Sequence, residues 1–306
     1  MAATPEPARG TDAARESRRG AKRIPRRAAA GRRSFTSTIK ALDALAASGA
    51  QVSVRIDDLD RGTSVLVGDD FLSLPIAGLG VVPLLVEVAA QFEAGTLEPL
   101  EIVDRAGLDP VAVSGLWQHL RAPALPLSDV AALAASAGDA LAANALLARV
   151  GLPAVRARVE QLGLSRSALM DGFRDVRGPD DAPHVALGST REYAHLFAAL
   201  VNSEAVSPGV SAQVAEWLSR EHDLSLVGAS TGLDPFAHDN DEHGLLFINK
   251  TGRAPGIRTE AGVLAGPRAG VAYALFVCFD DLSIAHRLRA HDAFRALGVE
   301  LMEYVF

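Results

Sequence analysis

The sequence predicts an α+β fold, in which strands come from both ends of the chain and helices from its middle. Leucines and alanines at helical spacing over 38–48 precede two runs of alternating apolar residues, 52–56 and 63–67. Near the other end, apolar runs at 245–248 and 261–264 flank a turn that contains proline and glycine, which indicates a β-hairpin. Most of the chain between these strands is apolar at helical spacing.

The remaining elements follow from the same spacing. Pro75 and several glycines precede a helix over about 81–92, which is apolar nearly all round and therefore belongs in the centre of a domain. Two helices rich in alanine and leucine follow, with a break near Gly138, and Ser189 begins another helix. We also expect helices over 154–162, 210–220 and 284–304 and an apolar strand over 271–279.

Length and composition describe a globular chain. With 306 residues, 49% of them hydrophobic, it can bury a large core in one domain or in two lobes. No uninterrupted apolar stretch approaches the roughly 20 residues that span a bilayer, so we expect no membrane segment. Cys278 is the single cysteine, which excludes an internal disulfide and a cysteine-rich metal site.

Positive charge is concentrated at the N-terminus. Residues 1–33 hold ten Arg or Lys and three acids, a net +7 in a chain of net −7, so the other residues carry −14. This segment lacks aromatic residues, and we expect a disordered basic tail ahead of a folded domain at 34–306. Nucleic-acid binding by the tail is an alternative, but a solvated arm, or one that rests on the acidic body, is favoured over it.

The basic tail ends in a pattern that looks like a twin-arginine export signal, at 32–35. Such a signal requires an uncharged apolar segment to follow, whereas Lys40 and Asp43 interrupt the segment that does. The leucine and alanine spacing there favours the first amphipathic helix of the folded domain. We therefore expect a cytoplasmic protein, with twin-arginine export as the alternative.

Lys250, Thr251 and Gly252 stand where an apolar run ends, just before a turn that contains Gly256. An ammonium group and a hydroxyl at a strand end can hold an anion, and a glycine lets a ligand lie against the backbone. This placement of Lys-Thr-Gly resembles the third motif of the class A β-lactamases and related penicillin-recognising serine hydrolases. We predict a ligand-binding edge at these three residues and the following Arg253.

The first catalytic motif of that family corresponds to 75–83, ahead of the predicted central helix. Aligned without a gap, Gly78 stands at the position of the nucleophilic serine and Val81 at that of the lysine base. An acyl-enzyme needs an attacking oxygen, and a hydroxyl needs a base within hydrogen-bond reach. The sequence thus predicts that this motif is inactive.

Two serines elsewhere are alternative nucleophiles. Ser37 and Lys40 form a literal S-x-x-K, but they precede the first strand and lie on the terminal helix. Ser73 comes five residues before Gly78 and has no lysine one helical turn later. We interpret both matches as accidental.

The break near Gly138 resembles the family's second motif, a Ser-Asp-Asn loop that leads into a helix. Asp139 matches, whereas Gly138 replaces the serine and Ala140 replaces the asparagine. The hydroxyl that would relay a proton and the amide that would hold a substrate carbonyl are therefore absent. Asp139 either contributes to ligand binding or bonds to loop backbone, and the second interpretation is favoured.

The family's deacylating glutamate has no counterpart, because no glutamate occurs between Glu160 and Glu192. The acids of this stretch are interpreted as loop carboxylates and turn formers; they are Asp171, Asp175, Asp180 and Asp181. The loop at 235–243 gathers two histidines and three acids without the spacing of a known metal motif. We expect neither a metal ion nor a cofactor.

The resemblance covers about 35–306 and implies a three-layer αβα architecture. One lobe, about 34–75 and 205–306, would hold a five-stranded antiparallel sheet flanked by helices, and a helical lobe would span about 76–204. The amides of Gly78 and Arg253 would form an oxyanion hole. The resemblance implies a catalytically inactive β-lactamase-like protein that binds a small carboxylate-bearing ligand or a protein partner; the alternative is an active serine hydrolase or β-lactamase.

Overall fold

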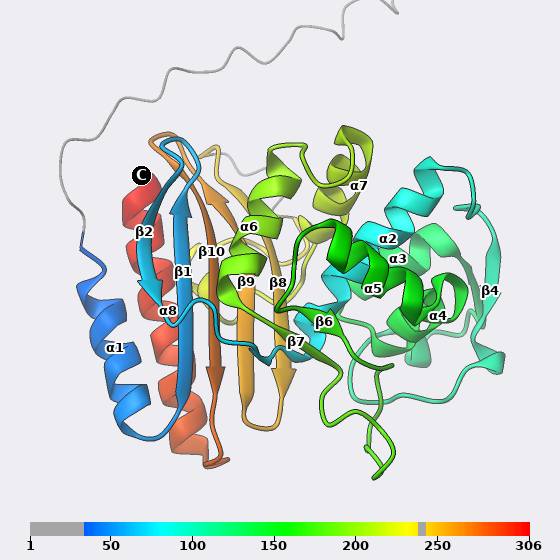
Figure 1. Cartoon of the computed structure of the whole chain (residues 1–306), viewed down its shortest axis with the longest axis horizontal. Helices are drawn as coiled ribbons and strands as arrows, with labels where there is room; N and C mark the ends of the chain where they lie inside the picture. The colour runs from blue at the N-terminus through cyan, green and yellow to red at the C-terminus, as the bar shows by residue number, and fades with distance from the viewer. Residues whose placement is uncertain (1–33, 238–242) are drawn as a thin grey trace, which may run out of the picture.

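The computed structural model describes residues 34–237 and 243–306. Its centre is a five-stranded antiparallel sheet in the order β2-β1-β10-β9-β8. The strands are β1 (Gln51–Asp58), β2 (Thr63–Gly68), β8 (Leu246–Ala254), β9 (Ile257–Ala265) and β10 (Gly270–Cys278). Strands from the two ends of the chain meet in the middle of the sheet, where β1 pairs with β10 (Figure 1).

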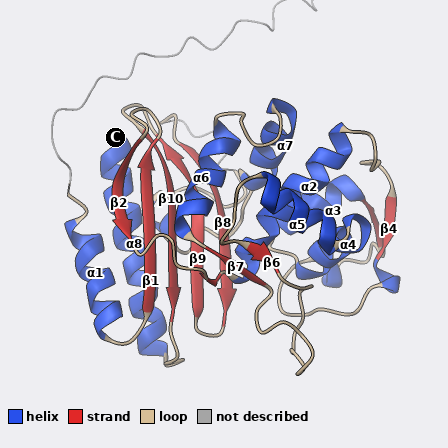
Figure 2. Cartoon of the chain, in the orientation of Figure 1, coloured by secondary structure: helices blue, strands red, loops and turns tan. Residues whose placement is uncertain are grey.

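Helices cover both faces of this sheet, which makes three layers (Figure 2). The first helix, α1 (Thr36–Ala47), and the last, α8 (Ile284–Val305), lie together against one face. Their leucines and Phe294 join side chains of the sheet in one buried cluster. The opposite face is covered by α6 (Thr190–Val201), whose Tyr193 ring packs edge-on against Phe276 of β10.

A second lobe of helices lies beside the sheet and surrounds α2 (Val81–Glu93) (Figure 1). The first ten residues of α2 are all buried, which explains why the sequence there is apolar on every side. The neighbouring helices are α3 (Leu127–Ser136), α4 (Ala140–Val150), α5 (Leu152–Gln161) and α7 (Pro208–Leu218).

Short strands and 3-10 turns complete the fold. A three-stranded sheet in the order β3-β7-β6 joins Leu74–Pro75, Ala186–Gly188 and Ala168–Leu169. A two-stranded sheet pairs β4 (Ile102–Asp104) with β5 (Ala124–Pro126). Single 3-10 turns occupy Ala77–Gly80, Arg105–Gly107, Trp117–His119 and Val227–Ser230.

The predicted fold class is confirmed, including the five antiparallel strands and the helices on both faces. The expected division into lobes differs at two helices. The range 76–204 was expected to be a helical lobe, yet α6 packs on the sheet, and α7, expected in the other lobe, packs against α2. In both cases the lobe to which the helix belongs is determined by where its apolar face packs, and not by its position in the chain.

The predicted basic tail at 1–33 and part of the loop at 235–243 lie outside the described residues. Cys278 is half-buried, and burial raises the pKa of its thiol to about 12. Within the described ranges no single helix is long and apolar enough to cross a membrane; only α4 and α5 taken together, bent by 86°, meet that length and composition.

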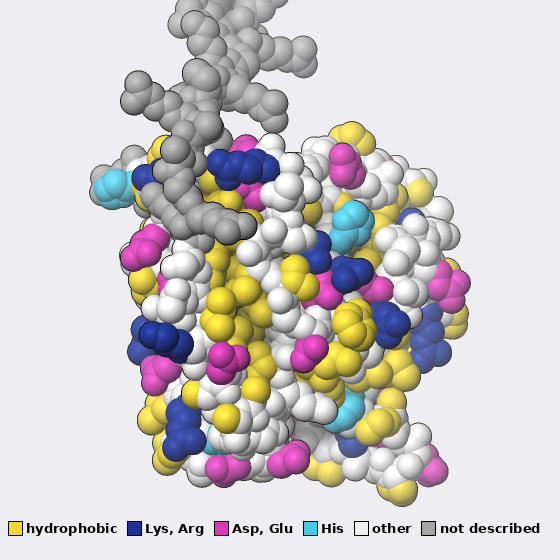
Figure 3. Space-filling model, turned by 60° about the vertical axis from the view of Figure 1, so that its left-hand side comes forward, with side chains coloured by type: hydrophobic (Ala, Val, Ile, Leu, Met, Phe, Trp, Pro, Cys, Tyr) yellow, Lys and Arg dark blue, Asp and Glu magenta, His cyan; other side chains and the backbone are white. Residues whose placement is uncertain are grey.

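Surface charge is mixed on the face shown in Figure 3. Acidic and basic side chains are scattered there, and hydrophobic side chains gather in a band between them. No single sign of charge dominates this face, so it offers no basic stripe of the kind that tracks a nucleic-acid backbone.

Candidate functional site

A pocket of about 610 Å³ lies at the junction of the two lobes. Six segments form its wall: the start of α2, residues 113–114, the break between α3 and α4, the loop at 173–185, residues 221–223 after α7, and the β8–β9 hairpin. The residues predicted from the three motifs therefore meet at one place, although they are far apart in sequence. Gly78, Val81, Gly138, Asp139 and Lys250 all line it.

The start of α2 has an unusual backbone where it meets the pocket. Ala77 has a φ of 47°, which is rare for a residue with a Cβ and is typical of functional sites. Gly78 follows at the pocket wall, and a Cβ added there would lie 3.5 Å from the Thr251 carbonyl oxygen, in ordinary contact. Val81 is buried at 2% exposure. The space for a serine side chain exists at Gly78, but the pocket has neither its hydroxyl nor an amine at Val81.

Asp139 is bound to the backbone around it. Its carboxylate accepts hydrogen bonds from the amides of Leu116 and Trp117, both at 2.7 Å, and from Ala142 at 2.9 Å. The last of these caps the N-terminus of α4. Asp139 is 1% exposed, so these contacts support the structural interpretation of the aspartate over ligand binding.

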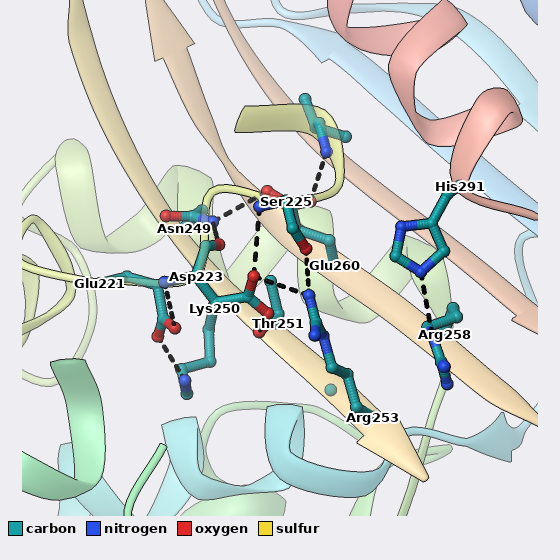
Figure 4. A network of polar contacts seen from close by, with 12 residues as sticks. Glu221, Asp223, Ser225, Asn249, Lys250, Thr251, Arg253, Arg258, Glu260 and His291 are labelled. Carbon is teal, nitrogen blue, oxygen red and sulfur yellow. Dashed lines mark hydrogen bonds and ion pairs between the residues drawn. The ribbon is translucent and has the colours of Figure 1, made fainter. Parts of the chain in front are cut away.

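The lysine of the third motif is held by an internal carboxylate. Lys250 and Glu221 form a buried ion pair, and each side chain is 2% exposed. Glu221 follows α7, and Lys250 points from β8 toward the break between α3 and α4, where a Cβ added at Gly138 would lie 3.6 Å from its Nζ (Figure 4). The sequence analysis missed Glu221, because 29 residues separate it from Lys250 and no local pattern marks the pair.

Burial raises the pKa of Glu221 to about 7, and Lys250 opposes the rise. The carboxylic acid is therefore half-ionised near neutral pH. Glu221 therefore gains negative charge as the pH rises through about 7.

A second internal carboxylate, Asp223, binds the groups that follow the lysine. It accepts a hydrogen bond from the Thr251 hydroxyl at 2.7 Å and forms an ion pair with Arg253 at 2.7 Å (Figure 4). Burial alone would raise the pKa of Asp223, but Arg253 and hydrogen bonds from Thr251 and Ser225 hold it below its usual value. All three polar side chains of the predicted anion-binding edge are thus occupied by acids of the chain itself.

Gly252 has a different role from the predicted one. A Cβ on this residue would collide with the carbonyl oxygen of Ile76 and the hydroxyl of Thr259, and would lie 3.0 Å from the Leu79 amide nitrogen. The side of Gly252 that faces these atoms is therefore occupied by the backbone that precedes α2, and a ligand cannot lie there. This contact fixes β8 against the turn that carries Gly78.

The acids of the loop at 171–185 bond mainly to their own surroundings. Asp175 accepts hydrogen bonds from the amides of Ala112 and Val113, and Asp171 pairs with Arg174 and Arg177. Asp181 accepts from the Gly178 amide. Asn144 of α4 clamps the loop by bonding both backbone polar groups of Phe173. These contacts agree with the interpretation of the acids as loop carboxylates and turn formers.

The two alternative serines lie away from the pocket. Ser37 is in α1, where its amide donates to Glu300 of α8, and Lys40 is exposed on the same helix. The Ser73 hydroxyl donates to the Arg166 carbonyl oxygen. Neither serine lines the pocket, and among the described residues no group of three or more His, Cys, Asp or Glu side chains is arranged to hold a metal ion.

Comparison with known proteins gives one family and one fold. The profile described as "Beta-lactamase enzyme family" matches residues 34–305. A β-lactamase structure from Sphaerobacter thermophilus is 21% identical with a TM-score of 0.75, and covers 89% of this chain and 97% of its own. The structure of PBP-A is 18% identical with a TM-score of 0.71, and covers 88% and 95%. An ancestral class A β-lactamase is 17% identical with a TM-score of 0.70, and covers 89% and 100%. No curated protein sequence matches.

Substitution of Gly252 by alanine is expected to destabilise the fold by about 3 kcal/mol, because the added methyl group would force β8 away from the backbone before α2. Urea unfolding followed by circular dichroism measures this change. Gly107→Ala is the matched control, since a Cβ there meets nothing within 4 Å, and it should change the stability by less than about 0.5 kcal/mol. Equal stability of the two variants would contradict the proposed close contact.

The pKa of Glu221 predicts a pH dependence of stability. Because the folded pKa of about 7 exceeds the usual value of 4.5, the contribution of Glu221 is complete below pH 4.5 and is lost as the pH rises to about 7. Urea unfolding at pH 5, 6, 7 and 8 should show a loss on the order of 2–3 kcal/mol that is missing in Glu221→Gln. Glu216→Gln, an exposed change on α7, is the control and should keep the wild-type profile.

Proposed function

Because the chain belongs to the β-lactamase enzyme family, we propose that it is a catalytically silent member whose pocket binds a ligand without cleaving it. One observation supports this proposal: Gly78 and Val81, which the motif resemblance places at the positions of the nucleophile and its base, both line the pocket. Loss of both groups typically lowers the rate on the order of a million-fold, which leaves only the background from binding and the oxyanion hole.

The other hydroxyl groups of the pocket do not replace the missing pair. Ser114 donates its hydrogen bond to the Gly138 carbonyl oxygen at 2.7 Å, and Thr251 donates to Asp223. Activation of a hydroxyl requires that it donate to a base that can take its proton. Lys250 does not supply that base for either group, because it is bound to Glu221, and Asp223 is a weak base for Thr251, because Arg253 and hydrogen bonds hold its pKa below the usual value.

We propose a small carboxylate-bearing molecule as the ligand, with a protein partner as the second class of binder. The carboxylate would bind Thr251 and Arg253 and would have to displace Asp223, which now holds both. The backbone amides of Gly78 and Arg253 would serve as donors to a ligand carbonyl oxygen, since both residues line the pocket. Such a ligand competes with Asp223 for Thr251 and Arg253. The affinity of the ligand therefore depends on the charges of the groups near Asp223.

The first test is covalent labelling. Incubation of the purified protein with a fluorescent penicillin, followed by intact mass measurement, is expected to give no adduct, because Gly78 offers no attacking oxygen. An active class A β-lactamase treated in the same way is the positive control.

An adduct on this chain would support the alternative, an active serine hydrolase or β-lactamase. The variants Ser37→Ala and Ser73→Ala then locate the nucleophile, because only the variant of the reacting serine would lose the label. Turnover of a chromogenic cephalosporin without an adduct would contradict catalytic silence equally.

The second test uses benzylpenicillin as a carboxylate probe. Binding of this anion should be tighter at pH 6 than at pH 8 by up to about tenfold, because Glu221, whose pKa burial raises to about 7, places less negative charge in the pocket wall at the lower pH. Isothermal titration calorimetry at constant ionic strength measures the two constants. Glu221→Gln should bind equally at both pH values. A pH effect that survives in this variant would assign the titration to a group other than Glu221.

A further inference from the structure

A second hollow lies outside the pocket, between the β8–β9 hairpin and one side of α8. Its volume is about 400 Å³. We call it the arginine groove, after its charged lining of Arg253, Arg258, Arg287, His291, Asp292 and Arg295. Three of these residues, at 287, 291 and 295, are spaced four apart on α8 and therefore lie along one side of the helix.

The positive charges of the groove exceed its acids. Arg253 pairs with Asp223 at 2.7 Å and Arg295 with Asp292 at 3.2 Å. Arg287 is exposed and forms no ion pair with any residue that the structure describes.

Arg258 is half-buried without a carboxylate bound to it among the described residues. Its guanidinium group donates to the carbonyl oxygens of Ala254 and Ile257, at 2.9 and 2.7 Å, and faces Nε2 of His291 at 3.4 Å (Figure 4). Burial and the nearby Arg253 and Arg287 lower the pKa of Arg258. Burial and the same arginines lower the pKa of His291 as well. The fold thus holds several like charges together at a cost that a bound anion would remove.

We propose that the arginine groove binds a small molecule that carries two or more phosphate charges. Guanidinium groups present paired donors that match phosphate oxygens, and Arg258 and Arg287 are not neutralised by an internal acid. The volume suits a small ligand. A long nucleic acid is disfavoured, because the chain beyond residue 33 carries a net charge of −14.

The test is isothermal titration calorimetry of the full-length protein with inorganic pyrophosphate at constant ionic strength. We expect saturable binding with one site per chain. Arg287→Ala should weaken it about tenfold, as expected for the loss of one charge-assisted hydrogen bond. Arg289→Ala is the matched control, because Arg289 is exposed on the same helix but does not line the groove, and its affinity should change by less than about twofold.

A third variant distinguishes a specific loss of binding from misfolding of the protein. Asp292→Asn removes the single acid of the groove lining and should tighten pyrophosphate binding by about threefold or more, which a misfolded protein would not do. Absence of saturable binding, or equal weakening by Arg287→Ala and Arg289→Ala, would overturn the proposal. Succinate, a dicarboxylate, should bind more weakly than pyrophosphate; equal or tighter binding would overturn the assignment to phosphate.

Discussion

The close approach of β8 to the backbone before α2 determines the geometry of the pocket. Gly252 has no side chain, so Ile76 and Leu79 lie directly against it, and Thr259 of the neighbouring strand donates to the Ile76 carbonyl oxygen at 3.0 Å. This contact joins the sheet to the central helix of the other lobe. It also fixes the turn with the positive φ of Ala77, so that Gly78 faces Thr251 across the pocket wall. The conformation of this backbone therefore does not depend on which side chain stands at position 78.

Internal acids occupy the polar side of the pocket that this contact creates. A buried lysine without a partner is strongly unfavourable, and Glu221 satisfies it at the cost of its own desolvation, which is why burial raises the pKa of that acid to about 7. Asp223 likewise binds Thr251 and Arg253. Arg253 and the hydrogen bonds that Asp223 accepts keep the pKa of Asp223 below its usual value. The two acids therefore respond differently to pH: Asp223 stays charged, while Glu221 changes charge near neutrality.

The sequence was sufficient for the fold and for the positions of the motifs, because apolar periodicity and motif spacing are local patterns. The buried α2, the break at Gly138 and the hairpin of Lys250 were all predicted from such patterns. The partners of Lys250 and Arg253 were not, since Glu221 and Asp223 lie on a loop about 30 residues away whose path depends on the packing of α7. The direction in which Gly252 faces was also beyond local sequence, because it depends on tertiary contacts with Ile76 and Leu79.

Under the proposed function, the positions without catalytic side chains lie on several elements, so a single substitution would not create an active site. A serine side chain would fit at Gly78. A serine at Gly138 would be strained, because φ there is +56°, and Lys250 would still be neutralised by Glu221. A lysine at Val81 would enter a site that is 2% exposed, where an unpaired ammonium group costs several kcal/mol. A serine placed at Gly78 alone would therefore have no lysine one helical turn later to activate it, which is consistent with the proposal that the pocket binds a ligand without cleaving it.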